Sequence, residues 1–185
     1  MKVEDTALDG VKIVTPDRFG DERGFFSETY NQRRWEERGL PPLRFVQDNH
    51  SLSRETGVLR GLHFQTAPFA QDKLVRVTRG RVLDVAVDIR RSSSTFGRHV
   101  AVELSAENWR QLLVPIGFAH GFCTLEPDTE VVYKVTNFYS APNDRGLAWD
   151  DPDLDIGWPD AQDRLILSDK DRRWPRLRDL ADAFD

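Results

Sequence analysis

Short runs of apolar residues recur along the chain, and turn-forming residues separate them. In several runs apolar and polar positions alternate, as they do in a β-strand. The segment VLDVAVDI, for example, places Leu83, Val85, Val87 and Ile89 on one face and Asp84 on the other. The pattern predicts strands at residues 11–14, 25–30, 45–52, 59–65, 74–78, 82–89, 99–104, 111–114, 119–124 and 130–138.

Signals for helices are few. Asn31 is a good N-cap for a short helix that runs through Arg38, and Gly39 would end it. A terminal helix is predicted at residues 177–184, and Gly80, between two strand runs, is typical of a hairpin turn. About ten short strands with few helices indicate an antiparallel sandwich, jelly roll or small barrel. A doubly wound α/β fold would need helices between the strands.

The length of 185 residues fits one domain, residues 1–185, with an N-terminal arm at about 1–30 and a C-terminal helical tail at about 165–185. Mean hydropathy is −0.55, and no apolar stretch approaches the roughly 20 residues of a membrane-spanning helix. The first ten residues are polar and acidic, unlike a signal peptide. The single cysteine, Cys123, excludes an internal disulfide framework and fits a reducing, cytoplasmic setting.

Charge argues against a nucleic-acid partner, because 31 acidic and 26 basic residues give a net charge of −5. Only five of the basic residues are lysines, and the other 21 are arginines. The guanidinium fork matches phosphate and carboxylate geometry. A few converging arginines could therefore still hold an anionic ligand on this acidic protein.

The histidines do not have the spacing of a metal site. His50, His63, His99 and His120 include no pair at two, three or four residues' separation. A metal-binding jelly roll typically supplies two histidines one residue apart, and here Gln65 takes the second place. We therefore expect neither a metal nor another cofactor.

Three polar clusters lie within apolar surroundings: residues 19–28, residues 46–51 with 58–65, and residues 114–122. Polar groups in apolar strands must be paired, or they serve a site. In the third cluster, Gly117 and Gly121 permit a close backbone approach around His120. These clusters are the candidate functional regions.

The motifs in and around these clusters resemble those of the dTDP-4-dehydrorhamnose 3,5-epimerase family. The resemblance extends from about residue 3 to residue 180. It implies a jelly-roll (cupin) fold, no metal, and a dTDP-4-keto-6-deoxyhexose substrate. It also implies a homodimer that exchanges N-terminal strands, with residues 25–28 as the exchanged element. The matching motifs are FGDERGFF, FVQDNHS, VLRGLHFQ, KLVR, DVAVDIR, TFG, LSAEN, GFAHGF, YKVTNFY and LSDKD.

The resemblance also implies catalytic roles. The hydrogens on C3 and C5 are α to the C4 ketone, so inversion needs a base on one ring face, an acid on the other, and positive charge near O4. His63 matches the base, Tyr133 the acid and Lys73 the group that stabilises the enolate. Asp171 matches the carboxylate that pairs with His63, and Asp169 is a nearby alternative.

Other residues match substrate contacts of the family. Arg23 and Arg60 would contact the diphosphate and sugar, Tyr139 would stack on thymine, and His120 would lie near the ketone. Asp144 stands where we expect a glutamate in close relatives, and its shorter side chain weakens the case for a direct contact. The remaining expected contacts are Phe26, Glu28, Gln47, Asp48, Asn49 and Lys170.

Arg60 and His63 pose a geometric difficulty, because they would point to opposite faces of an ideal strand. Both reach one ligand only if a bulge near Gly61 breaks the alternation, if one lies at a strand end, or if Arg60 comes from the partner subunit.

Three other functions fit parts of this sequence. An epimerase of the same family could act at C3 or C5 alone. A metal-dependent cupin oxygenase or isomerase is disfavoured by Gln65, and a non-catalytic sugar-nucleotide binder would not need the histidine, aspartate and tyrosine set.

Overall fold

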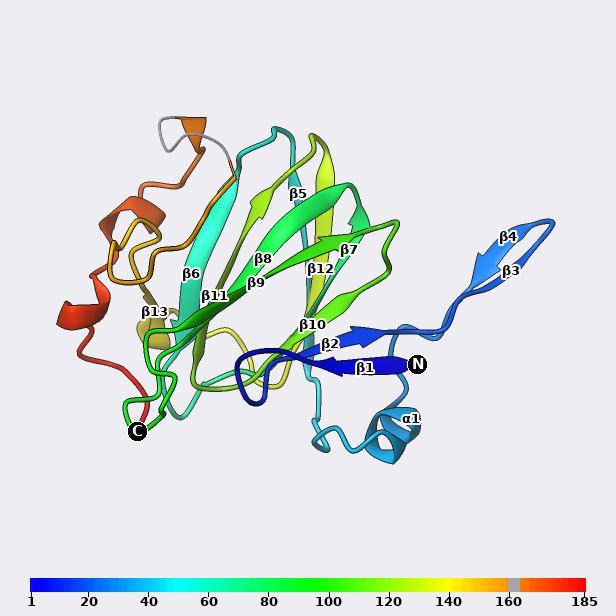
Figure 1. The fold of residues 1–185 in the computed structure, drawn as a ribbon, viewed down its shortest axis with the longest axis horizontal. Coiled ribbons are helices and arrows are strands. Elements are labelled where there is room, and N and C mark those ends of the chain that lie inside the picture. The colour runs from blue at the N-terminus through cyan, green and yellow to red at the C-terminus, as the bar shows by residue number, and fades with distance from the viewer. Residues whose placement is uncertain (160–163) are drawn as a thin grey trace.

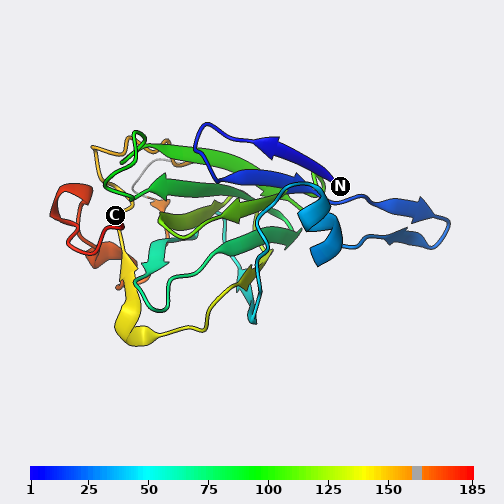
Figure 2. The same ribbon diagram turned by 90° about the horizontal axis from the view of Figure 1, so that it is seen from below.

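The computed structural model describes residues 1–159 and 164–185 and contains two antiparallel β-sheets packed as a sandwich (Figures 1 and 2). The six-stranded sheet has the order β1-β2-β10-β7-β12-β5, and the five-stranded sheet the order β13-β6-β11-β8-β9. This agrees with the predicted jelly-roll sandwich. The strands are β1 (Lys2–Asp5), β2 (Lys12–Thr15), β5 (Gln47–Ser53), β6 (Leu59–Gln65), β7 (Lys73–Arg79), β8 (Arg81–Asp88), β9 (His99–Ser105), β10 (Gln111–Val114), β11 (Phe118–Thr124), β12 (Thr129–Val135) and β13 (Asp144–Gly146).

The main core lies between the two sheets. Val75 and Val131 of the six-stranded sheet share a buried cluster with Val82 and Leu104 of the five-stranded sheet. Burial of apolar area of this kind contributes about 25 cal/mol per Å². The apolar cluster fills only part of the space between the sheets, and polar side chains occupy the rest.

The outer faces of both sheets are also partly covered. The C-terminal segment packs Leu154 and Leu180 against the five-stranded sheet. On the other sheet, helix α1 (Gln32–Glu37) buries Trp35. The Asn31 side chain caps this helix by accepting a hydrogen bond from the backbone N–H of Arg34, 3.2 Å away, as predicted. No helix of the described residues is long and apolar enough to cross a membrane.

Every predicted strand run overlaps a strand, and residues 59–65 and 111–114 have the predicted bounds. The run predicted at 25–30 is shorter, because its strand β4 (Gly24–Phe26) ends at Phe26. Strands β1, β13 and β3 (Phe19–Asp21) were not predicted. Strands β3 and β13 have only three residues each, too few to show a periodic pattern, and β1 (KVED) has a single apolar residue.

Gly80 is not a hairpin turn. It joins β7 to β8, and these strands belong to different sheets. Its φ of +74° is in the left-handed region, and a Cβ there would lie 2.3 Å from the Oγ1 of Thr129. The sequence signal for a sharp turn was correct, but the turn is a corner of the sandwich.

The helix predicted at residues 177–184 is also wrong. Only Leu177–Asp179 forms one 3-10 turn, η4. Beyond it, the backbone N–H of Phe184 donates to the carbonyl of Ile89, and Leu180 is buried in the outer cluster. An isolated helix of this length is marginal, so contacts with the sheet determine the conformation of the tail.

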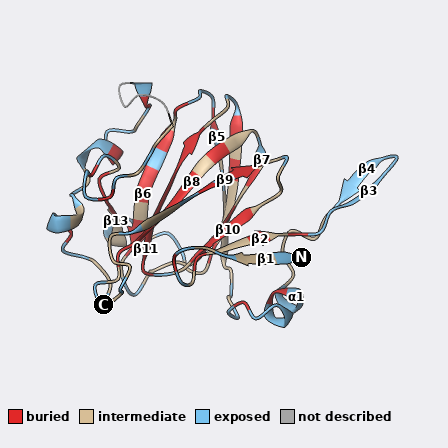
Figure 3. Cartoon of the chain, viewed as in Figure 1, coloured by how far each residue is buried: buried red, intermediate tan, exposed pale blue. Residues whose placement is uncertain are grey.

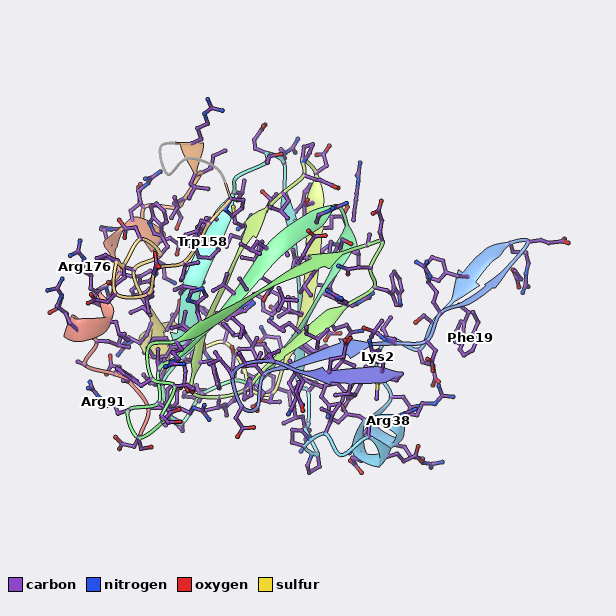
Figure 4. The ribbon with its side chains drawn as sticks, viewed as in Figure 1. Lys2, Phe19, Arg38, Arg91, Trp158 and Arg176 are labelled. Carbon is purple, nitrogen blue, oxygen red and sulfur yellow. The ribbon has the colours of Figure 1, made fainter. Side chains whose placement is uncertain are left out.

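Strands β3 and β4 form a hairpin that extends away from the sandwich (Figure 1). We call residues 19–26 the arm. It is shorter than the predicted segment 1–30, because β1 and β2 belong to the six-stranded sheet. Figure 3 colours the arm as exposed, and Figure 4 shows Phe19 at the base of the arm, outside the sandwich. Phe19, Phe25 and Phe26 are 57, 56 and 66% exposed.

Candidate active site

The polar part of the sandwich interior holds two adjoining cavities of about 230 and 280 Å³. One wall is formed by β5, β7 and β12 and the other by β6 and β11. His63, Lys73, Tyr133 and Lys170 line both cavities. The first cavity is also lined by Gln47, Asn49, Tyr139 and Asp144, and the second by Arg60, His120 and Asp171.

A bulge in β6 resolves the difficulty over Arg60 and His63. Against β11, His63 pairs with His120 and Arg60 pairs with Phe122, so β6 carries one extra residue between the two pairs. Gly61 has φ +136°, which favours glycine, and both Arg60 and His63 consequently line the second cavity. The bulge is therefore the correct alternative within this chain.

His63 contacts Asp171, not Asp169. Its Nε2 lies 2.5 Å from Oδ1 of Asp171, which is 4% exposed in the 3-10 turn η3 (Asp171–Arg173). Burial alone would raise the pKa of Asp171, but hydrogen bonds from His63 and other side chains lower it overall. An ionised carboxylate at Nε2 leaves Nδ1 of a neutral His63 as a proton acceptor.

Trp174 packs against the His63–Asp171 pair. Its Nε1–H donates to Oδ1 of Asp171 over 3.3 Å, and its ring centroid lies 6.2 Å from that of His63. A Cβ on Gly146, the β13 partner of His63, would lie 2.3 Å from the Trp174 ring. A glycine is thus needed for the indole to lie against this strand.

Lys73 is buried between the sheets, with its Nζ donating to the backbone carbonyl of His63 over 3.2 Å. Burial lowers the pKa of Lys73 to about 8, and the nearby carboxylates of Asp144 and Asp84 oppose that shift. The ammonium is therefore available in the cavity near neutral pH.

Tyr133 faces the same cavity as His63 but comes from the other sheet, on β12. Burial raises the pKa of Tyr133; the charge of Arg60 lowers it and that of Asp144 raises it further. The phenol therefore keeps its proton at neutral pH and can act as an acid.

The first cavity is bordered by a polar cluster. The Oη of Tyr139 donates to Oδ2 of Asp144 over 3.1 Å, and Lys170 forms an ion pair with the same carboxylate. The side chain of Gln65 holds the backbone on both sides of Tyr139, donating to the carbonyl of Phe138 and accepting from the N–H of residue 140. This presents a 60% exposed aromatic ring beside the cavity.

Four expected site residues lie outside both cavities. Asp48 is on the outer face of its sheet, paired with Lys134 at 2.9 Å. Arg23 is at the tip of the arm and paired with Asp21. Phe26 is exposed on the arm, and Glu28 accepts a hydrogen bond from Asn31 beside α1.

Sequence reasoning missed Asp84, which is fully buried and bonded to His120. Its signal was an acidic residue between Val82 and Ala86, on a face that becomes the interior of the sandwich. Ser51 and Phe122 also line the second cavity. The described residues contain no group of three or more metal-ligating side chains.

Comparisons with known proteins identify the family of this chain. Residues 5–179 match the family model described as dTDP-4-dehydrorhamnose 3,5-epimerase. A dTDP-4-dehydrorhamnose 3,5-epimerase from Shigella flexneri is 55% identical over 184 residues, which is 100% of this chain and 99% of that protein.

Solved structures are equally similar. The enzyme of that name from Bacillus anthracis, with TDP and pyrophosphate bound, has a TM-score of 0.91 and 52% identity, covering 95% of this chain and 98% of that one. A 3,5-epimerase from Legionella pneumophila in complex with dTDP-4-keto-L-rhamnose has a TM-score of 0.91 and 46% identity, covering 96% and 93%. This chain belongs to the dTDP-4-dehydrorhamnose 3,5-epimerase family.

Proposed function

We propose that the protein is a 3,5-epimerase that converts dTDP-4-dehydro-6-deoxy-D-glucose into dTDP-4-dehydro-L-rhamnose. The observation that carries the proposal is the placement of His63 and Tyr133 on different sheets, facing one cavity. A sugar ring between them would meet a base on one face and an acid on the other. Inversion at carbon requires this arrangement.

In the proposed mechanism, Nδ1 of His63 removes the proton from C3 or C5, each of which is α to the ketone. Asp171 holds the ring through Nε2 and stabilises the imidazolium that forms. Tyr133 then donates a proton to the opposite face of the enolate. The raised pKa of Tyr133 keeps that proton in place until the carbanion forms.

Negative charge develops on O4 as each proton leaves. The Lys73 ammonium and the His120 ring in its imidazolium form line the same cavity and would stabilise this charge. Arg60 lines the second cavity and would bind the diphosphate or the sugar. In the first cavity, Gln47, Asn49, Tyr139, Asp144 and Lys170 would contact the nucleotide.

We also propose that two chains form a cytoplasmic homodimer in which each arm completes the partner's site. Arg23 and Phe26 are exposed on the arm and lie outside their own cavities. Phe25 packs edge-on against Trp109, 5.0 Å between ring centroids, yet remains half-exposed. A partner surface would bury these apolar groups.

Solvent exchange tests the proposed reaction. The protein is incubated with dTDP-4-keto-6-deoxyglucose in D₂O, and NMR follows C3 and C5 separately. Deuterium at both carbons with an L-sugar product is expected, and the His63→Ala variant should show neither. Exchange at one carbon would replace the proposal with a mono-epimerase, and exchange at neither would refute epimerase function. Loss of activity after chelation would favour the metal-dependent alternative.

A further inference from the structure

His120 forms a second histidine–aspartate pair beside the first. It lies directly opposite His63 on the neighbouring strand, and its side chain is 8% exposed. Its Nε2 is 2.8 Å from Oδ1 of Asp84, which is on β8 and fully buried. Both histidines therefore use Nε2 to contact a buried carboxylate, and both line the second cavity.

The environment of Asp84 differs from that of a purely structural carboxylate. Its Oδ2 is buried with no hydrogen-bond partner among the described residues. Asp88 lies on the same strand with the same burial, yet its oxygens accept bonds from Arg90, Ser93 and Thr95. Burying a half-satisfied carboxylate is unfavourable unless nearby positive charge balances it.

The groups around Asp84 supply such charge from the cavity side. Its register partners are apolar, Val102 on β9 and Phe122 on β11. Among the described residues, two titratable groups face Asp84: His120 on β11 and Lys73 on β7. The negative charge of Asp84 stabilises the Lys73 ammonium. Asp84 thus interacts with His120 and Lys73, the two groups that would contact the ketone oxygen in the proposed reaction.

The contact also determines which nitrogen of His120 is free. A carboxylate accepts a hydrogen bond, so Nε2 must carry a proton. This leaves Nδ1 for a ligand, as an acceptor in the neutral ring and as a donor in the imidazolium, which the carboxylate stabilises.

We propose that Asp84 is a positioning residue of the active site. It holds the ring of His120 through Nε2 and stabilises the imidazolium form, whose Nδ1–H donates to the ketone oxygen of the substrate, and it balances the buried charge of Lys73. This inference rests on the proposed epimerase function. Asp84 acts through its neighbours and does not itself line either cavity.

The test compares Asp84→Asn with Asp88→Asn, a buried control on the same strand. A neutral amide does not stabilise the His120 imidazolium as a carboxylate does, so Asp84→Asn should lose the charged ring whose Nδ1–H donates to the ketone oxygen. We expect kcat to fall about 10²-fold, the effect of losing one donor to a developing oxyanion, with KM within threefold of wild type. Asp88→Asn should leave both constants within threefold of wild type, after correction for any unfolded fraction. An unchanged kcat in Asp84→Asn would overturn the proposal.

A second readout does not require turnover. Long-range ¹H–¹⁵N correlation spectra report the tautomer of His120, with His120→Gln providing the assignment. Wild-type protein should show a proton on Nε2 of His120, and Asp84→Asn should show a mixture of the two tautomers. A neutral wild-type ring protonated only at Nδ1 would overturn the proposal. That outcome is decisive even if the variant does not fold. If wild type fails the exchange test but retains the Nε2 proton, the epimerase proposal has failed and the pairing stands.

Discussion

The Nζ of Lys73 donates a hydrogen bond to the backbone carbonyl of His63, 3.2 Å away. Lys73, which would stabilise the enolate, is therefore hydrogen-bonded to His63, the residue that would generate it. Because these residues lie on different sheets, the contact also fixes the spacing between the two walls of the cavity. Base and cation are positioned before any ligand arrives, which reduces the reorganisation needed during reaction.

The pH dependence of turnover should reflect Lys73. Its pKa is lowered to about 8 by burial, so the ammonium is present below that pH and is lost as pH rises through it. We expect kcat to decline above about pH 8. The pKa of Tyr133 is raised above 10, so loss of its proton falls at higher pH. Lys73→Met should reduce kcat about 10²-fold to 10³-fold and remove the decline near pH 8, and persistence of that decline in the variant would assign it to another group.

Tyr133→Phe should separate proton removal from inversion. His63 remains able to remove a proton and exchange it with solvent, but the acid on the other face is gone. We expect deuterium to enter the substrate with retained configuration, while formation of the inverted product falls about 10²-fold to 10⁴-fold. NMR of the recovered sugar nucleotide measures both. Equal losses of exchange and inversion would contradict the assignment of Tyr133 as the acid.

Gly146→Ala should impair catalysis without any change in a residue that lines a cavity. The new Cβ would lie 2.3 Å from Trp174, so the indole must move away from Asp171 and His63. We expect a lower kcat and a loss of stability on the order of 1–3 kcal/mol from overpacking. Gly157→Ala is the control, because nothing lies within 4 Å of its Cβ. Equal kinetics and Tm for both variants would show that the glycine is not required.

Mixing two inactive variants tests the exchanged arm. Arg23→Ala damages only the arm, and His63→Ala damages only the cavity. If arms are exchanged, a mixed dimer contains one intact site, formed by the Arg23→Ala cavity and the arm of the other chain. Activity should then rise on mixing, to about a quarter of wild type for random pairing with full exchange. No recovery in a mixture shown to exchange subunits would place Arg23 in its own chain's site or outside the reaction.

The strands that carry the site were predictable where apolar positions alternate, as in residues 130–135, where Val131, Tyr133 and Val135 share a face. The pairing of His63 with Asp171 followed from motif resemblance alone, because 108 residues separate the two side chains. Arg60 could be placed only with the structure. A bulge depends on the register between two strands, and that register is not visible in one segment.

Other features depended on contacts that a sequence pattern does not contain. The tail at 177–184 lies against the outer face of the five-stranded sheet, because Leu180 is buried there and the backbone of Phe184 pairs with that of Ile89 and Arg91. Asp84 was recognisable as the polar member of an alternating strand, but only the packing of two sheets makes that face an interior. Strand β3 of the arm has only three residues, too few to be recognised by periodicity.

The corner at Gly80 has a mechanical consequence. One residue carries the chain from β7, which bears Lys73, to β8, which bears Asp84, and Thr129 lies tightly against it. With no spare length at this junction, the two layers cannot slide past each other without breaking strand pairing. The spacing of the two layers at this corner is therefore set by the covalent connection between β7 and β8, in addition to the side chains packed between the sheets.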